Sequence, residues 1–442
     1  MDIVKPSILP GFMELNPKEQ LAFNEIREII KSTYEDFGFL PIDTPVIEKS
    51  EVLLAKGGGD TEKQVYRFDK GDTDLTLRFD LTVPLARYST MRFSDLEFPF
   101  KRYQIAKVYR GERNQKGRFR EFYQADVDII GNGSLAIEND AEMPAIIYQI
   151  FKKLNFGPFT IKINNRKVLL GFYKSLGVED LAMILRIIDK MDKVSEEKTV
   201  EALKEEGLDQ KAIDSIFDFI NIEGSPKDVI RNLKKLPVES DEFNLGLEEL
   251  EKVISILPSY NIPEDYYKID LKLQRGLDYY TGTIFETIMN DYPSLGSVCG
   301  GGRYDNLAGY YTDRKMPGVG VSIGLTRLFY QLNEAGLIDV KTSHESSVLV
   351  VPMEGFSADA TKVATSLRNA KITTQVYYED GKMGKKFSYA DKIGIRYVIV
   401  IGEDEVARKA YSIKDMKTGE SFYMKTAEIV NKIYTDRSDD DE

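Results

Sequence analysis

The first third of the chain alternates between helical and extended patterns of apolar residues. Residues 16–38 carry apolar side chains at helical spacing and end at a glycine, which predicts a helix that ends there. The next segment, FLPIDTPVIE over residues 39–48, is predicted to be an extended strand. Residues 74–131 then alternate between strand-like and loop-like pieces. The start of the chain therefore predicts a helix that leads into a sheet.

The middle and the end of the chain follow further patterns. Residues 166–260 are helical in pattern and highly charged, whereas strand and turn signals return over residues 265–321. From residue 346, apolar segments such as SSVLVVPM, ITTQVYY and YVIVIGEDE alternate with helical ones. That alternation predicts a small, largely parallel α/β domain. The last residues, DRSDDDE, predict a disordered acidic tail.

A period-2 pattern in residues 101–131 gives the first indication of a site. Two strand-like pieces, 102–110 and 121–130, flank a loop rich in arginine and lysine. Four residues of the second piece share one face: Phe122, Gln124, Asp126 and Asp128. The ordinary interpretation is an edge strand with its polar side in water. An aromatic ring and two acids beside a basic loop instead suit an aromatic base, a phosphate and an ammonium or imidazole group.

Composition excludes several classes of protein. The 442 residues exceed one ordinary core and predict two or three domains. No apolar run is long enough to cross a bilayer, so no membrane partner is expected. The first residues follow neither a secretory signal nor a transit peptide, and we therefore expect a cytoplasmic protein.

The scarcity of cysteine and histidine limits the chemistry. One cysteine, Cys299, excludes an internal disulfide and a cysteine-cluster zinc site, and we interpret it as a packed side chain. One histidine, His344, excludes histidine-based triads and multi-histidine metal sites, and its polar surroundings indicate a solvated linker residue. The chemistry must therefore use arginines, carboxylates, tyrosines, the main chain and bound Mg²⁺.

The segment RGLDYYTGTIFE, residues 275–286, combines features that neither a core strand nor a solvated loop favours. It places an arginine, an acid and two adjacent tyrosines between glycines. We interpret the segment as a binding site for a small polar ligand, although Tyr279 is better explained as a packed aromatic residue. For Tyr304, in CGGGRYDNL, packing and ligand contact are equally good explanations.

Several segments resemble the motifs of one enzyme family. FKRYQIAKVYRGERNQKGRFREFYQADVDIIG is similar to motif 2 of class II aminoacyl-tRNA synthetases, in its histidyl-tRNA synthetase form. RGLDYYTGTIFE resembles that family's histidine signature, GVGVSIGLTRL its motif 3 and GFLPIDTPVIE its motif 1. The carboxy-terminal KKFSYADKIGIRYVIVIGEDE resembles its anticodon-binding domain. The motifs follow the family's order, and the resemblance covers nearly the whole chain.

The resemblance implies a fold class and a domain order. We expect an α+β catalytic domain built on an antiparallel sheet with a helical insertion, followed by an α/β anticodon-binding domain. The expected bounds are 1–165 and 261–335 for the catalytic domain, 166–260 for the insertion, 336–345 for a linker, 346–435 for the anticodon-binding domain and 436–442 for the acidic tail. Motif 1 further implies a homodimer. Its expected apolar residues, which serve both core and partner, are Leu21, Phe23, Ile26, Ile29, Ile30, Phe39, Leu40 and Val46.

The resemblance also implies a binding site for L-histidine. Arg275 is expected at the substrate carboxylate and the α-phosphate. Asp80 and Thr82, two residues apart on a segment expected to be extended, suit the α-ammonium group, while Tyr280 and Asp128 suit the two imidazole nitrogens. Asp80 and Asp128 stand where the family often has glutamate. The expected histidine-binding residues are Asp80, Thr82, Arg110, Gln124, Asp128, Arg275, Tyr280 and Tyr304.

The ATP site implied by the resemblance uses arginines. The expected ATP-binding residues are Arg110, Glu112, Arg118, Phe122 and Arg327. Guanidinium groups match phosphate oxygens two at a time, so Arg110 is assigned to the α-phosphate and Arg118 and Arg327 to the outer phosphates. Glu112 and Phe122 are expected at the adenine. Arg110 and Arg275 are the expected catalytic residues, and Mg²⁺ is expected on the ATP phosphates without a dedicated protein metal site.

The implied activity is that of a histidine–tRNA ligase, which makes histidyl-adenylate from L-histidine and ATP and transfers it to tRNA(His). One alternative is a non-catalytic, histidine-sensing paralogue that regulates histidine biosynthesis. Another is an RNA-binding module without turnover. The net charge of -12 disfavours RNA, but residues 346–438 carry an excess of Lys and Arg over Asp and Glu. The expected basic cluster there contains Lys382, Lys385, Lys386, Lys392 and Arg396, for which a solvated face is the other explanation.

Overall fold

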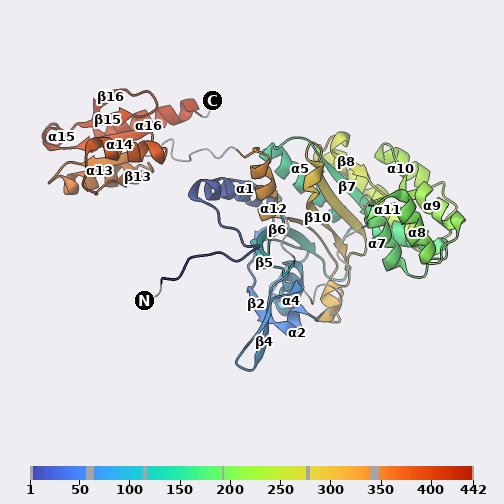
Figure 1. Cartoon of the computed structure of the whole chain (residues 1–442). Coiled ribbons are helices and arrows are strands. Elements are labelled where there is room, and N and C mark those ends of the chain that lie inside the picture. The colour runs from blue at the N-terminus through green and yellow to red at the C-terminus, as the bar shows by residue number, and fades with distance from the viewer. Residues whose placement is uncertain are drawn as a thin grey trace. The chain divides into compact units, whose positions relative to one another are not determined.

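The computed structural model describes residues 3–55, 64–112, 117–191, 194–274, 279–338 and 348–440 of the chain (Figure 1). The chain clusters into two compact units: Met1–Glu14 with Phe23–Ile338, and Leu15–Ala22 with Asp339–Glu442. No helix among the described residues is both long and apolar enough to cross a lipid bilayer. Arg275, the glycine run at residues 56–60 and His344 lie outside the described residues.

An eight-stranded sheet forms the frame of the first unit, in the order β1-β5-β6-β11-β10-β9-β7-β8. Its strands are β1 Leu40–Pro41, β5 Phe100–Tyr109, β6 Glu121–Ile130, β7 Phe159–Asn165, β8 Tyr267–Ile269, β9 Thr283–Met289, β10 Ser297–Tyr304 and β11 Gly318–Ile323. Neighbours pair antiparallel from β5 to β7, whereas β1 pairs with β5 and β8 with β7 in parallel. The expected antiparallel sheet is confirmed for its central strands, and the whole sheet is mixed.

Among the described residues, the helices of the first unit outside the segment that follows β7 are α1 Pro17–Asp36, α2 Ser50–Leu53, α4 Thr82–Met91, α5 Glu138–Leu154 and α12 Leu325–Glu334. The helix expected over residues 16–38 is confirmed as α1, and Gly38 follows it with a φ of 78°, a conformation that favours glycine. Helix α5 packs against β7 and β11, and α12 packs against β6.

The apolar residues near the start of the chain separate into two groups. Phe23, Ile26, Ile30 and Phe39 are all buried in the core of the first unit. Leu40, on the edge strand β1, is instead 64% exposed. The second group also includes Leu21, Ile29 and Val46, which are only partly buried. Half of the eight residues that the sequence suggested for core and partner therefore lie in the core, and the other half remain at least partly on the surface.

The β5–β6 hairpin carries the expected polar face. The strands predicted over 102–110 and 121–130 are confirmed as β5 and β6, shifted by at most two residues. Helix α12 contacts the apolar face, where the Tyr123 amide donates a hydrogen bond of 2.8 Å to the Thr326 hydroxyl. The opposite face, which carries Phe122 and Gln124, lines a cavity. The period-2 prediction of one packed and one polar face is confirmed.

Helix α4 was missed by the sequence analysis, which expected only strands and loops between residues 74 and 131. The Asp80 carboxylate accepts a hydrogen bond from the Val83 amide at 3.0 Å and so satisfies a donor at the start of the helix. Thr82 is the first residue of α4, so the expectation that it lies on an extended segment with Asp80 was wrong. Beside α4, strands β2 Ile47–Lys49, β3 Arg67–Lys70 and β4 Thr73–Leu77 form a three-stranded sheet in the order β2-β4-β3.

The charged segment after β7 is helical, as its pattern predicted. Its described helices are α6 Arg166–Ser175, α7 Leu181–Asp189, α8 Glu196–Glu205, α9 Gln210–Ile220, α10 Pro226–Leu233 and α11 Asp241–Ile256. Each follows a residue whose side chain accepts a backbone N–H of the first turn: Asn165, Asp180, Ser195, Asp209, Ser225 and Ser240. Such caps are typical helix starts, so local sequence determines where these helices begin.

The second unit contains a five-stranded sheet in the order β13-β12-β14-β15-β16. Its elements are β12 Val348–Pro352, α13 Ser357–Asn369, β13 Thr374–Val376, α14 Met383–Lys392, β14 Tyr397–Ile401, α15 Glu403–Arg408, β15 Tyr411–Asp415, β16 Ser421–Met424 and α16 Thr426–Asp440. The prediction of parallel strands is right for β13, β12 and β14, but β15 and β16 pair antiparallel and extend the sheet. Helix α16 includes residues that the sequence analysis assigned to an acidic tail.

Candidate active site

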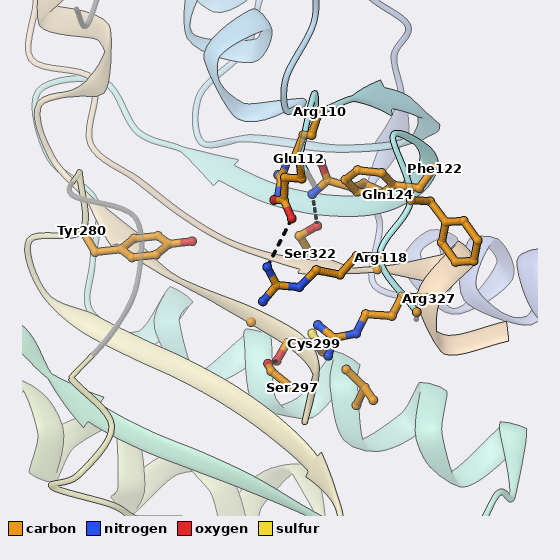
Figure 2. Close-up of a pocket in the computed structure, with 15 residues that line it drawn as sticks. Arg110, Glu112, Arg118, Phe122, Gln124, Tyr280, Ser297, Cys299, Ser322 and Arg327 are labelled. Carbon is orange, nitrogen blue, oxygen red and sulfur yellow. Dashed lines mark hydrogen bonds and ion pairs between the residues drawn. The ribbon is translucent and has the colours of Figure 1, made fainter. Parts of the chain in front are cut away.

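A cavity of about 350 Å³ opens on the polar face of the β5–β6 hairpin (Figure 2). Arg110, Glu112 and Phe122 come from the hairpin, Cys299 from β10 and Arg327 from α12. We call this space the outer cavity. Its volume lies within the range of small-molecule binding sites in proteins.

Three arginines give the outer cavity its positive charge. Figure 2 shows the Arg118 and Arg327 side chains extending into the space that Tyr280 faces. Arg118 is paired with the Glu112 carboxylate at 3.3 Å, and Arg327 donates to the Leu295 carbonyl at 2.8 Å. Because the Arg118 side chain is 52% exposed, its ion pair is weak and can exchange for a charged ligand.

Arg110 lies deeper and is held by aromatic rings. Its guanidinium lies 4.4 Å from the Phe79 ring centroid and 5.1 Å from that of Phe122, and its Nε donates to the Phe79 carbonyl at 3.1 Å. Burial lowers the pKa of Arg110 from its ordinary value, while Asp80 and Glu112 act in the opposite direction. The stacking fixes the plane of a guanidinium at the junction of two cavities.

A second, inner cavity of about 40 Å³ adjoins the first, and Arg110, Gln124, Tyr280 and Ser322 line both. The inner cavity is further lined by carboxylates, a threonine and aromatic rings: Asp80, Asp126, Asp128, Thr82, Tyr279 and Tyr304. Three carboxylates around so small a space favour a ligand that carries positive charge and N–H donors.

Asp128 is held by groups on two neighbouring strands. The register places it opposite Arg102 on β5, and the two side chains form a fully buried ion pair of 2.6 Å. The Tyr304 hydroxyl donates a second hydrogen bond of 2.6 Å to the same carboxylate. Burial raises the pKa of Asp128, and Arg102 opposes that shift. Arg102 was not predicted as a site residue, although a charged residue at the third position of a buried strand was a signal.

Asp126 is the second functional candidate that the sequence analysis did not assign. It lies opposite Ser322 of β11 and accepts a hydrogen bond from the Ser322 hydroxyl. Burial raises the pKa of Asp126 to about 7, with Arg102 opposing the shift and Asp128 adding to it. The polar face of the period-2 pattern already included Asp126, but nothing in the pattern distinguished it from Asp128.

Glycines of β11 make room for these side chains. A Cβ atom at Gly320 would lie 2.1 Å from Oδ1 of Asp128, and one at Gly318 would lie 2.5 Å from the Tyr304 ring. Both approaches are closer than any side chain permits, so only glycine fits at either position. The GVG sequence of residues 318–320 therefore positions Asp128 and Tyr304.

The tyrosines of the inner cavity pack on one another. The Tyr279 ring lies 4.9 Å from that of Tyr280 and 5.9 Å from that of Tyr304, both edge to face. Burial raises the pKa of each of the three, so their hydroxyls stay protonated and can donate hydrogen bonds. The prediction that Tyr279 packs is confirmed, although the same residue also lines the cavity.

The structure brings the sequence-predicted site residues together. Eleven of the twelve line one or both cavities: Asp80, Thr82, Arg110, Glu112, Arg118, Phe122, Gln124, Asp128, Tyr280, Tyr304 and Arg327. The twelfth, Arg275, lies outside the described residues. Cys299 is buried, as predicted, and burial raises the pKa of its thiol, which leaves it uncharged. Within the described residues no cluster of three or more His, Cys, Asp or Glu side chains could hold a metal ion.

The basic cluster expected in the second unit is only partly exposed. Lys386 is buried against the Tyr377 ring, with its ammonium 5.7 Å from the ring centroid. Arg396 is paired with Asp415 at 3.5 Å and with Asp436 at 3.6 Å. Lys382, Lys385 and Lys392 remain exposed. The expectation of five clustered surface charges was wrong for Lys386 and Arg396, which stabilise the fold of this unit.

Two family models match the chain. One, described as histidyl-tRNA synthetase, matches residues 11–328, and one described as anticodon binding domain matches residues 347–435. A histidine–tRNA ligase of Clostridium tetani is 59% identical over 433 residues, which cover 98% of this chain and 99% of the relative. One of Finegoldia magna is 46% identical over 431 residues, 98% of this chain and 100% of the relative. A crystal structure of histidyl-tRNA synthetase from Nostoc sp. is similar with a TM-score of 0.88 at 40% identity, covering 98% of this chain and 99% of that one.

Proposed function

The chain belongs to the histidyl-tRNA synthetase family, and from that premise we propose how its two cavities carry out the reaction. The reaction is the ligation of L-histidine to tRNA(His) at the expense of ATP. We assign ATP to the outer cavity and L-histidine to the inner one. The observation that carries this assignment is that an arginine-lined space and a carboxylate-lined space meet at Arg110 and Gln124.

The outer cavity suits ATP because its charges and its aromatic ring match the nucleotide. Arg118 and Arg327 bind the β- and γ-phosphates, and Arg110 binds the α-phosphate at the junction. One face of Phe122 packs on Arg110, so the adenine stacks on the ring from the other side, with Glu112 accepting from its amino group. Mg²⁺ enters as part of the ATP substrate and offsets the negative charge of the phosphates.

The inner cavity suits L-histidine because it offers carboxylates for the charged and N–H groups of the ligand and a tyrosine hydroxyl for a ring nitrogen. Asp80 and Thr82 bind the α-ammonium group, while Asp128 and the Tyr280 hydroxyl bind the two ring nitrogens. A site built from buried polar groups rejects a ligand of the same shape without the ring nitrogens, because those groups would be left unpaired.

The first step joins the two ligands at the junction. A carboxylate oxygen of histidine attacks the α-phosphorus in line, a new P–O bond forms, and the bond to the β-phosphate oxygen breaks to release pyrophosphate. Arg110 offsets the negative charge that develops on the α-phosphate. Arg275, assigned from the sequence to the same phosphate and to the substrate carboxylate, remains a prediction.

The second step transfers histidine to tRNA. A terminal ribose hydroxyl attacks the carbonyl carbon of the adenylate, and AMP leaves with the bonding electrons. The only histidine of the chain is His344, which the sequence analysis assigned to a linker, so the proton of the ribose hydroxyl passes to a phosphate oxygen of the substrate. A single-turnover transfer rate that depends on an enzyme group titrating near neutrality, and that keeps this dependence in Asp126→Asn, would contradict this route.

Assembly and location complete the proposal. We infer a cytoplasmic homodimer built by the first unit, with the second unit bound to the anticodon of tRNA(His). Leu40 on the edge strand β1 and Ile47 on β2 are both exposed, and a surface cavity of about 500 Å³ is lined in part by Pro41, Ile42 and Val46. An apolar edge of this kind supports a partner of the same chain.

The test is the charging of purified tRNA(His) with labelled L-histidine and ATP by the full-length chain. A ligase produces histidyl-tRNA and AMP. The histidine-sensing paralogue would bind histidine without either product, and an RNA-binding module would retain tRNA without consuming ATP. Relatives matched over the full chain are histidine–tRNA ligases, so the paralogue is the weaker alternative.

A further inference from the structure

Three side chains at the junction of the cavities form a continuous hydrogen-bond relay. Gln124 Nε2 donates to the Ser322 hydroxyl oxygen at 2.7 Å, and the Ser322 hydroxyl donates to Oδ1 of Asp126. The register of β6 and β11 creates both hydrogen bonds. Ser322 lies opposite Asp126, and Gln124 lies two residues before Asp126 on the same face of β6. Figure 2 shows the bond between Gln124 and Ser322.

Counting protons fixes the direction of the relay. An ionised carboxylate only accepts hydrogen bonds, so the single proton of the Ser322 hydroxyl must point to Asp126. The Ser322 oxygen can then only accept, and it must face the amide nitrogen of Gln124 rather than the amide oxygen. Gln124 Oε1 consequently points away from the relay. It is buried and has no hydrogen-bond partner among the described residues.

We propose that Asp126 and Ser322 are positioning residues that orient the Gln124 amide so that its oxygen accepts a hydrogen bond from the α-ammonium group of the substrate. The inference rests on the proposed function, in which the amino acid lies in the inner cavity. Gln124 lines both cavities, so it lies where the substrate carboxylate meets the α-phosphate. The α-ammonium group is one carbon away from that carboxylate, and it is a donor that needs an acceptor.

Protonation of Asp126 reverses the relay. A protonated Asp126 donates to Ser322, which frees the Ser322 proton to donate to Gln124 Oε1, and the amide then turns N–H groups toward the ammonium. Burial raises the pKa of Asp126 to about 7, so this change falls near neutral pH. The titratable and charged groups that face Asp126 are Arg102, Asp128, Asp80, Arg110, Tyr34, Tyr280 and Cys299. Histidine binding therefore strengthens as pH rises through about 7.

A double-mutant cycle tests the relay by histidine-dependent exchange of pyrophosphate into ATP. Ser322→Ala and Gln124→Ala are each expected to raise the KM for histidine by about tenfold, the effect of one hydrogen bond, with the KM for ATP changed less than about twofold. Once Gln124 is removed, Ser322→Ala has no further effect on the KM for histidine, because the serine acts only through the amide. Multiplicative effects of the two substitutions would overturn the proposal.

Controls separate positioning from folding. Ser89→Ala removes another buried serine, on α4 and outside both cavities, and is expected to leave both KM values unchanged. Ser322→Thr keeps the hydroxyl and is expected to restore the KM for histidine to within about threefold of wild type. If Ser322→Ala unfolds at the same temperature as wild type and its KM for histidine is unchanged, the relay is contradicted.

The pH arm remains decisive if Ser322→Ala does not fold. The ratio of kcat/KM for histidine between Asp126→Asn and wild type cancels the titration of the substrate itself. This ratio is expected to fall about tenfold between pH 6 and pH 8, because only wild type gains affinity when Asp126 ionises. If wild type shows histidine-dependent exchange but the ratio stays constant with pH, the inference is overturned and the proposed function stands. Absence of that exchange in wild type would overturn the proposed function together with the inference.

Discussion

Two carboxylates on one face of β6 are buried side by side and are stabilised in different ways. Asp128 has a buried arginine as its partner, whereas Asp126 has a serine hydroxyl. A charge without a charged partner is costly in a buried site, and burial accordingly raises the pKa of Asp126 to about 7. The same strand thus provides one carboxylate that is paired with a buried guanidinium and one that is held by a neutral hydroxyl.

Asp128→Asn should affect both stability and histidine binding. The substitution leaves the guanidinium of Arg102 buried without its ion-pair partner, so the free energy of unfolding should fall by about 3–5 kcal/mol. The KM for histidine should rise far more than the KM for ATP, because in the proposed site the lost charge faces the imidazole. Urea denaturation and pyrophosphate exchange measure the two effects. Asp69→Asn, at an exposed residue of β3, is the control, and equal losses for both substrates would mean that Asp128 only supports the fold.

Stability should depend on pH through Asp126. Its folded-state pKa of about 7 exceeds the ordinary value of 3.8, so the folded chain binds this proton more tightly than the unfolded chain does. Its contribution to the free energy of unfolding is therefore largest below about pH 4 and is lost as pH rises toward 7. Asp126→Asn removes that loss. Urea denaturation at pH 5 and pH 8 should show the variant gaining stability relative to wild type at the higher pH, and a pH-independent difference would contradict the burial cost.

Residue roles were predictable only in part. Alternation along residues 121–130 identified the polar face, because side chains of a strand point to opposite faces in turn. It could not identify which acid meets Arg102 and which meets Ser322, because those contacts depend on the register between strands far apart in sequence. The structure supplies that register, and with it the difference between Asp126 and Asp128.

At the scale of elements, the site depends on how closely β11 approaches β6. Helical period predicted α1 and strand alternation predicted β5 and β6, whereas α4 was missed. The Asp80 carboxylate accepts a hydrogen bond from Val83 at its start, but the sequence analysis assigned Asp80 only to the ligand. Strands β15 and β16 were also not predicted, because the alternation of apolar and helical segments in the sequence extends only to β14. Elements with a clear apolar period were thus predictable, whereas α4, whose Asp80 had been given another role, and the antiparallel strands β15 and β16 were not.

Gly320→Ala should damage the site through β11. A methyl group 2.1 Å from Asp128 Oδ1 forces the carboxylate or the strand to move, and overpacking of this kind costs about 1–3 kcal/mol. The KM for histidine should rise with that loss of stability. Gly309→Ala is the matched control, since nothing lies within 4 Å of its Cβ position. Wild-type kinetics in Gly320→Ala would show that the close approach of the strands is unimportant for the ligand.

At the scale of the whole molecule, two units with different chemistry share one chain. The order of the two folds along the chain was predictable, because the motifs follow one another in the family's order. The burial of Lys386 and Arg396 was not predictable, because it follows from packing within the second unit. The net charge of -12 says little about RNA binding, because a few exposed lysines on one unit matter more than the charge of the whole chain.

Leu40→Asp should convert the proposed homodimer to a monomer. Leu40 is 64% exposed on β1, the edge strand of the large sheet, so a carboxylate there disturbs a partner more than the fold. Leu245→Asp, at a leucine of α11 that is 48% exposed, is the matched control and should leave the dimer intact. Sedimentation velocity distinguishes the two states. A dimeric Leu40→Asp protein, or a monomeric wild type, would place the interface elsewhere or remove it.

The central claim is that the inner cavity recognises the imidazole ring through polar contacts and delivers histidine to ATP in the outer cavity. It is tested most directly by pyrophosphate exchange with wild-type protein, comparing L-histidine with thienylalanine, which has a five-membered aromatic ring without nitrogen. Rejection of an analogue that leaves buried polar groups unpaired reaches about 10⁴-fold in kcat/KM. The account predicts exchange with histidine and a discrimination of that order. Comparable exchange with both amino acids, or none with histidine, would contradict it.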